Sequence, residues 1–193
     1  MKMCNSSRFT PVILGLCVAL LGSVLAWAQQ PAPQAAAGLP NLKGVYYRAG
    51  SGWSNLPQTL LWPYNKSSAK WWLSVGPVDY FAELPGEHAR VQMADAQPMF
   101  YVRGLATQMG PRLIQLGAKQ DFRRVKMRNT NNFEPRIPFS NNALRDVDVA
   151  QVGPNVVSIR PRANLAPGEY AIVTPAGPDQ QRIYLGFDFR VAR

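Results

Sequence analysis

The fold is decided by the stretch from residue 156 to residue 191, which reads VVSIRPRANLAPGEYAIVTPAGPDQQRIYLGFDFRV. Apolar residues alternate with others over 156–160 and again over 183–191, which is the period of a strand with one buried face. In the last strand we expect Ile183, Leu185, Phe187, Phe189 and Val191 to face the core. Gly-Pro or Pro-Gly pairs separate similar short runs along the chain, and no long segment shows a helical period. The sequence therefore predicts an all-β protein.

Between these strands, Leu165-Ala-Pro-Gly-Glu-Tyr170 places a tyrosine two residues after a Pro-Gly turn. The pattern resembles the tyrosine corner of Greek-key sandwiches, in which the phenol bonds back to the connecting backbone. We therefore predict a structural role for Tyr170, and we predict an immunoglobulin-like (Greek-key) β-sandwich.

Changes in composition divide the chain into four parts. We predict a signal peptide over 1–28, a Pro/Ala-rich linker over 29–42, an aromatic-rich β-hairpin segment over 43–77 and a β-sandwich domain over 78–193. The hairpin is indicated by two short apolar runs on either side of Arg48-Ala-Gly-Ser-Gly52.

Residues 1–28 have the three parts of a secretory signal. A basic start is followed by the apolar run Val12–Ala26 and by the small-x-small site Ala26-Trp27-Ala28. We therefore expect export to the periplasm or to the outside of the cell, with retention of the segment as an anchor as the alternative. Cys4 and Cys17 both lie in this segment, so no disulfide is expected in the rest of the chain.

The chain is strongly basic, with 21 Lys and Arg against 11 Asp and Glu. The candidates for anion binding are Arg123, Arg124, Lys126 and Arg128. If Val125 points inward, the side chains at 124, 126 and 128 line one outer face at intervals of about 7 Å, twice the rise of a strand. Arg123 breaks that parity, so the hypothesis requires a bulge. A solubilising surface or an edge strand protected by charge explains the same residues without a ligand.

Three tryptophans, Trp53, Trp71 and Trp72, are candidates for aromatic contact with sugar rings or bases. They belong to a group of aromatic residues in the N-terminal third of the chain. The alternative is that this group forms a core against the neighbouring sheet.

Residues that support catalysis or metal binding are scarce. His88 is the single histidine, whereas zinc and copper sites built on histidine normally need at least two. The sequence contains no nucleophile elbow and no phosphate-binding loop. We therefore expect no enzymatic activity, no metal and no cofactor. The remaining enzyme hypothesis is a small hydrolase around Glu83, Glu87 and His88.

Several short motifs carry a family resemblance over most of the chain after the linker: Gly44–Tyr47 with Trp53, Pro98–Tyr101, Arg123–Val125, Ile137–Phe139 and Leu165–Tyr170. On these motifs the chain resembles a family of uncharacterised secreted bacterial proteins that have a Gly-Val-Tyr-Tyr hairpin and an immunoglobulin-like sandwich. The resemblance implies that fold and no activity. The final strand is also similar to that of small periplasmic copper-binding sandwiches. Their hairpin histidine is missing here, so this second resemblance supports the fold and not copper binding.

Together these observations predict a secreted, non-catalytic β-sandwich module that binds an anionic partner through a basic face. The partners that fit are acidic polysaccharide, lipopolysaccharide and extracellular DNA. The alternative is a structural or assembly subunit of the cell envelope or extracellular matrix, which would bind a protein partner through sheet edges. No membrane span is expected after the signal peptide.

Overall fold

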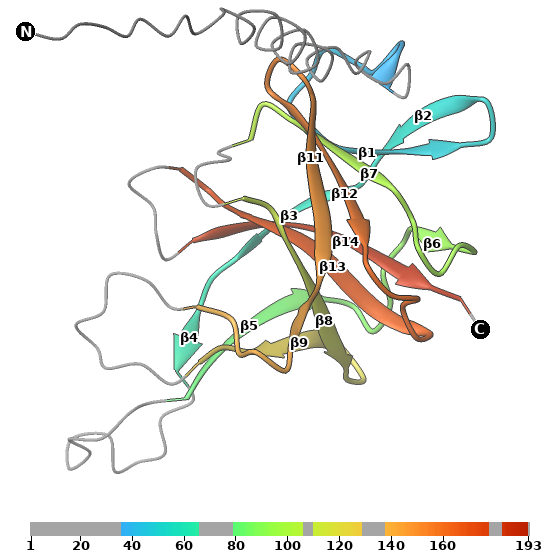
Figure 1. Cartoon of the computed structure of the whole chain (residues 1–193). Helices are drawn as coiled ribbons and strands as arrows, with labels where there is room; N and C mark the ends of the chain where they lie inside the picture. Colours follow the sequence, from blue (N-terminus) through green and yellow to red (C-terminus); the bar gives the residue numbers. More distant parts are fainter. Residues whose placement is uncertain (1–35, 66–78, 106–109, 129–137, 178–182, 193) are drawn as a thin grey trace, which may run out of the picture. The chain divides into compact units, whose positions relative to one another are not determined.

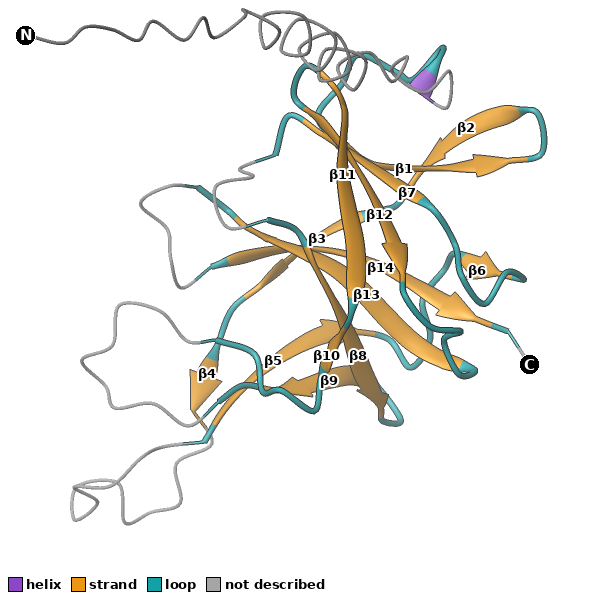
Figure 2. Ribbon diagram, in the orientation of Figure 1, coloured by secondary structure: helices purple, strands orange, loops and turns teal. Residues whose placement is uncertain are grey.

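The computed structural model describes residues 36–65, 79–105, 110–128, 138–177 and 183–192. These residues belong to one compact unit, Gln34–Arg193. They form strands joined by turns and loops, with one short helical turn near their start and no α-helix among them (Figure 2). The all-β prediction is confirmed for this part of the chain. A search of the same residues finds no helix with the length and apolar character that crossing a membrane requires.

The first sheet has five antiparallel strands. Their order is β11 (Val147–Gly153), β12 (Val156–Pro161), β7 (Phe100–Arg103), β1 (Gly44–Ala49) and β2 (Gly52–Asn55). β1 and β2 form the hairpin that the sequence predicts. Gly50 lies in its turn with a φ of 60°, a conformation that glycine adopts without steric cost. β11 and β2 are the edges of this sheet.

The second sheet is nearly barrel-shaped (Figure 1). Its order is β3 (Gln58–Leu61), β14 (Tyr184–Val191), β13 (Gly168–Pro175), β8 (Arg112–Ala118), β9 (Phe122–Lys126), β5 (Tyr80–Pro85) and β4 (Tyr64–Asn65). β10 (Leu144–Arg145) pairs with β8, and β6 (Gln92–Met93) pairs with β14. Only Trp62 and Pro63 separate β3, at one end of this order, from β4 at the other. Chain connectivity therefore brings the two ends of the sheet together.

Two main cores follow from this arrangement. The first lies between the sheets and includes Phe100 of β7, Ile159 of β12 and Phe189 of β14. The second lies inside the curved sheet and includes Leu84 of β5 and Val125 of β9. β13 and β14 contribute to both cores, which is why both faces of these strands are buried.

The last strand, β14, therefore has buried residues on both faces, unlike a strand with one face in solvent. Phe187, Phe189 and Val191 face the core between the sheets, as the alternation predicts. On the opposite side Tyr184 and Asp188 are also buried, with 6% and 4% of their surface exposed. That side faces the interior of the curved sheet, where Tyr184 joins the second core.

Tyr170 makes the hydrogen bond that its position after the Pro-Gly turn predicts. Its hydroxyl donates to the backbone oxygen of Ala166 at 2.7 Å, and the residue is 1% exposed. The ring stacks on Phe189, with 5.8 Å between the ring centres. Burial raises the pKa of the phenol above its ordinary value, and the nearby guanidinium of Arg145 opposes that shift.

The strands of the 43–77 segment are part of both sheets. β1 pairs with β7, β3 pairs with β14, and β4 pairs with β5. The predicted signal peptide, Trp71 and Trp72 lie outside the described residues.

Candidate functional site

Strand β9 carries three of the four predicted anion-binding residues, and its register with β5 is continuous. Arg123 and Val125 point into the curved sheet, with 3% and 2% of their surface exposed. Arg124 and Lys126 alternate with them and point outward. This corrects the sequence hypothesis at two points, because β9 has no bulge and Arg123 is not on the outer face.

Arg123 is buried because internal acceptors satisfy its guanidinium. Nη1 forms an ion pair with the Asp188 carboxylate at 2.5 Å and lies 3.8 Å from that of Glu169. Nε and Nη2 donate to the backbone oxygens of Gly86 and Pro85 at 3.0 and 2.9 Å. A charged group is buried without a large free-energy penalty only when it is paired in this way. Arg123 therefore has a structural role in joining β9 to β14 and to the turn after β5.

Glu169 extends this buried cluster to the surface. Its carboxylate accepts a backbone hydrogen bond at 2.8 Å and lies 3.0 Å from Nδ1 of His88. The His88 side chain is half-exposed, and Nε2 lies 3.7 Å from the Glu87 carboxylate. Glu83, the third residue of the hydrolase hypothesis, bonds to Tyr64 on the outer face instead. In the part of the chain that the structure describes, no group of three or more His, Cys, Asp or Glu is placed to hold a metal ion.

The outer surface of β4, β5 and β9 forms what we call the aromatic–arginine face. We define it by Tyr64, Phe81, Glu83, Phe122, Arg124, Lys126 and Arg128. The Arg124 guanidinium lies 4.7 Å from the ring centre of Phe81 and 5.8 Å from that of Phe122. The rings of Tyr64 and Phe81 are 6.3 Å apart. These contacts hold the Arg124 guanidinium in place beside the rings of Phe81 and Phe122.

Two carboxylates lie among the cations of this region. Asp79 forms an ion pair with Lys126 at 3.1 Å, and Glu83 accepts a hydrogen bond from the Tyr64 hydroxyl. Burial raises the pKa of the Tyr64 phenol, and the hydrogen bond to Glu83 and the charge of that carboxylate raise it further. The guanidinium of Arg124 opposes the shift. The phenol is therefore protonated at neutral pH and donates to Glu83. The aromatic–arginine face thus offers hydrogen-bond donors and acceptors as well as positive charge.

Among the three tryptophans singled out from the sequence, Trp53 is the one within the described residues. Its Nε1–H donates to the backbone oxygen of Ala37 at 3.1 Å. The Arg48 guanidinium lies 4.0 Å from the ring centre, and the Tyr101 ring meets it edge-on at 5.0 Å. Trp53 therefore holds the backbone at Ala37, which precedes β1, against the first sheet. Trp62, which precedes the aromatic–arginine face along the chain, is 60% exposed.

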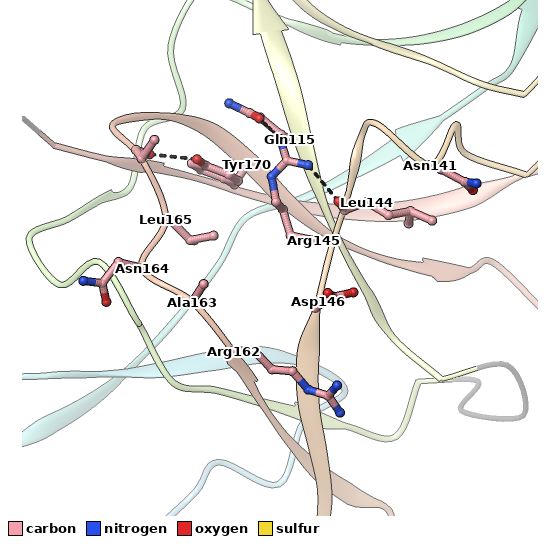
Figure 3. A pocket seen from close by; sticks show the side chains of 11 residues that line it. Gln115, Asn141, Leu144, Arg145, Asp146, Arg162, Ala163, Asn164, Leu165 and Tyr170 are labelled. Carbon is pink, nitrogen blue, oxygen red and sulfur yellow. Dashed lines mark hydrogen bonds between the residues drawn. The ribbon is translucent and has the colours of Figure 1, made fainter.

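A pocket of about 660 Å³ opens where the end of the first sheet meets β8, β10 and β13 (Figure 3). Its lining consists of Gln115, Asn141, Leu144, Arg145, Asp146, Arg162, Ala163, Asn164, Leu165, Ala166 and Tyr170. No sequence motif indicates this pocket, because short stretches far apart in the chain supply its wall. The one signal nearby is the Leu165–Tyr170 corner, which forms part of its edge.

In comparisons with known proteins, no protein-family model, curated protein or solved structure matches the chain.

Proposed function

We propose that this protein is an exported, non-catalytic module that binds an acidic polysaccharide through the aromatic–arginine face. The observation that carries the proposal is the position of Arg124 over the rings of Phe81 and Phe122. A stacked guanidinium loses little further conformational freedom on binding, and its N–H groups suit a carboxylate or sulfate. Lys126 and Arg128 continue the same side of the chain at strand spacing.

The composition of this face favours a glycan over the other anionic partners. Sugar rings stack on exposed aromatic side chains, and their hydroxyls bond to groups such as Glu83 and the Tyr64 phenol. A nucleic acid or a lipid phosphate surface presents densely spaced negative charge, which Glu83 and Asp79 would repel. An acidic polysaccharide offers both charge and hydroxyls, so it makes use of the whole face.

Export and fold are part of the same proposal. The apolar run and small-x-small site in 1–28 support export to the periplasm or beyond. The Tyr170–Ala166 hydrogen bond supports a relationship of the two packed sheets to Greek-key, immunoglobulin-like sandwiches.

The test is a salt titration of the purified protein against alginate, an acidic polysaccharide, with dextran as the neutral glycan. Binding to alginate should weaken steeply with salt, and dextran should not bind at comparable concentration. Changing Arg124, Lys126 and Arg128 together to Gln should lower alginate affinity by about tenfold or more.

The matched control removes the same charge elsewhere, by changing the exposed residues Arg90, Arg112 and Arg160 to Gln. It should change the affinity much less than the variant of the aromatic–arginine face. Equal losses in the two variants would show that net charge alone attracts the polymer. DNA and lipopolysaccharide are titrated in parallel, and binding to either in preference to alginate would overturn the choice of a glycan.

A second candidate function, an assembly subunit, is favoured by β11. This seven-residue strand is an edge of the first sheet, and most of it is exposed, including Val149 at 47%. An exposed edge can pair with a strand of another chain. Sedimentation should then show concentration-dependent oligomers that persist at high salt and disappear in Val149→Lys. A monomer at all concentrations would remove this candidate.

A further inference from the structure

The pocket near the Tyr170 corner contains an arginine held in place by neutral groups. Arg145 Nη1 donates to the backbone oxygens of Asn142 and Leu144 at 2.9 and 2.7 Å, and Nη2 donates to Oε1 of Gln115. Figure 3 shows the guanidinium between Gln115 and Leu144 on the pocket wall. These bonds use three of the five N–H donors of the side chain and leave two for a ligand.

The positive charge of Arg145 has no carboxylate partner within 4.0 Å among the described residues. Arg162, the other arginine of the lining, is paired with Asp148 at 2.8 Å. The hydrogen bond to Asp148 and the charge of that carboxylate raise the pKa of Arg162, and the charge of Asp146 adds a smaller effect in the same direction. Arg162 therefore has a carboxylate partner, whereas Arg145 has none within 4.0 Å among the described residues and is left to pair with an anion.

The rest of the lining is suited to hydroxyl groups. Asn141, Asn164 and Asp146 are exposed polar residues of the wall. Leu165 and Tyr170 are 6% and 1% exposed, but Ala163 and Ala166 are exposed, so the wall also offers apolar surface on which the C–H groups of a sugar ring can pack. The volume lies within the range of sites that bind small molecules, about 300–1,000 Å³.

We propose that this pocket binds a sugar acid, with the ligand carboxylate on the free N–H donors of Arg145 and its hydroxyls on the amides and Asp146. A guanidinium held in place matches a carboxylate in a planar, two-bond geometry. A phosphate monoester carries more negative charge, which Asp146 disfavours. The site is separate from the aromatic–arginine face, so this inference does not rest on polysaccharide binding there.

The test is an NMR titration of the purified protein with D-glucuronate, with D-glucose as the neutral ligand of similar size. Glucuronate should shift resonances of residues 141–146 and 162–166, and glucose at equal concentration should not. Arg145→Gln should weaken glucuronate binding by about tenfold or more, as expected for loss of a charged hydrogen-bonded pair. Arg160→Gln, which removes an exposed arginine outside the pocket, should leave the affinity unchanged.

A second variant keeps the inference testable if Arg145→Gln does not fold. Ala163 is exposed on the pocket wall, and Ala163→Phe fills part of the volume while Arg145 and its partners stay in place. Glucuronate binding should be lost in this variant, while the thermal midpoint stays near that of the unchanged protein. Equal shifts with glucuronate and glucose, or unchanged binding in a folded Ala163→Phe variant, would overturn the proposal.

The same variants separate the two proposals. Substitution of Arg124, Lys126 and Arg128 by Gln should leave glucuronate binding intact, and Ala163→Phe should leave alginate binding nearly intact. Failure of one site then says nothing against the other.

Discussion

Arg123 and Arg124 are neighbours in the chain, but they lie in opposite environments on β9. The inner residue is 3% exposed and is paired with Asp188 and Glu169. The outer one stacks on Phe81 and Phe122 and stays accessible. A run of basic residues therefore does not form one surface when it lies on a strand, because successive side chains point to opposite faces. The inner side of β9 therefore packs in the interior of the protein, and the outer side stays accessible at the surface.

The largest effect that separates the two sides is on stability. Arg123→Met leaves the Asp188 carboxylate buried without its ion pair and should lower the free energy of unfolding by about 3–5 kcal/mol. Arg124→Met removes a half-buried cation on the outer face and should change the free energy of unfolding by less than about 1 kcal/mol. Urea unfolding of the two variants measures the difference. Similar losses in the free energy of unfolding would mean that the buried ion pair of Arg123 contributes no more to stability than the outer contacts of Arg124.

If Arg123→Met does not fold, Asp188→Asn provides a milder version of the same test. The amide keeps the shape of the side chain and one acceptor but removes the negative charge. A loss of stability is still expected, because the buried guanidinium then lacks its closest anion.

The alternation on β9 could be predicted from the sequence, but its consequence for Arg123 could not. When no buried partner is known, a charged residue at an inward position of a strand indicates a bulge. The partners of Arg123 are Asp188 and Glu169, which lie far along the chain, so the sequence does not reveal them. The final strands and the Tyr170 hydrogen bond were predictable because their patterns are local. The curled second sheet was not, since it depends on the pairing of β3 with β14 and of β4 with β5. The pocket around Arg145 had no local pattern to reveal it.

The interior of the curved sheet can be tested at Gly186 of β14. A Cβ added there would overlap Cδ1 of Leu61, which is 0% exposed and so has little room to move. Gly186→Ala should therefore destabilise the protein by about 1–3 kcal/mol. Gly117→Ala places its Cβ at an ordinary 3.6 Å from the Arg124 backbone oxygen and should cost much less. In a Leu61→Ala background the cost of Gly186→Ala should largely disappear, and a full cost there would contradict the overlap.

Tyr170 and Tyr64 extend the comparison of buried and exposed side chains to hydroxyl groups. Tyr170→Phe should cost about 1 kcal/mol at neutral pH, because the Ala166 carbonyl loses its donor. Tyr64→Phe should cost less, since this residue is 37% exposed and water replaces the lost bond. Thermal unfolding of both variants at neutral pH measures the difference. Equal costs would mean that burial does not determine what the Tyr170 hydroxyl contributes.

The pH dependence of Tyr170 has a definite sign. Its pKa is raised in the folded state, so the folded chain holds the phenolic proton more tightly than the unfolded chain does. The resulting stability is present below the ordinary value of 10.0 and is lost as the pH rises through the folded pKa. The stability difference between the unchanged protein and Tyr170→Phe should therefore shrink above that pH. A difference that grows with pH would contradict the assignment.

The smallest expected effect concerns the outer side of β9 alone. Arg124→Lys keeps the charge but replaces the flat guanidinium that stacks on Phe81 and Phe122, and an exposed cation–π contact contributes about 0.5–1 kcal/mol. If the stacked group binds the polysaccharide, alginate affinity should fall by roughly two- to fivefold. Arg128→Lys is the matched control, because no ring contact of Arg128 occurs within the described residues. Equal affinities for the two variants would mean that charge alone, without the stacking, attracts the polymer, and would contradict the proposed role of the stacked Arg124.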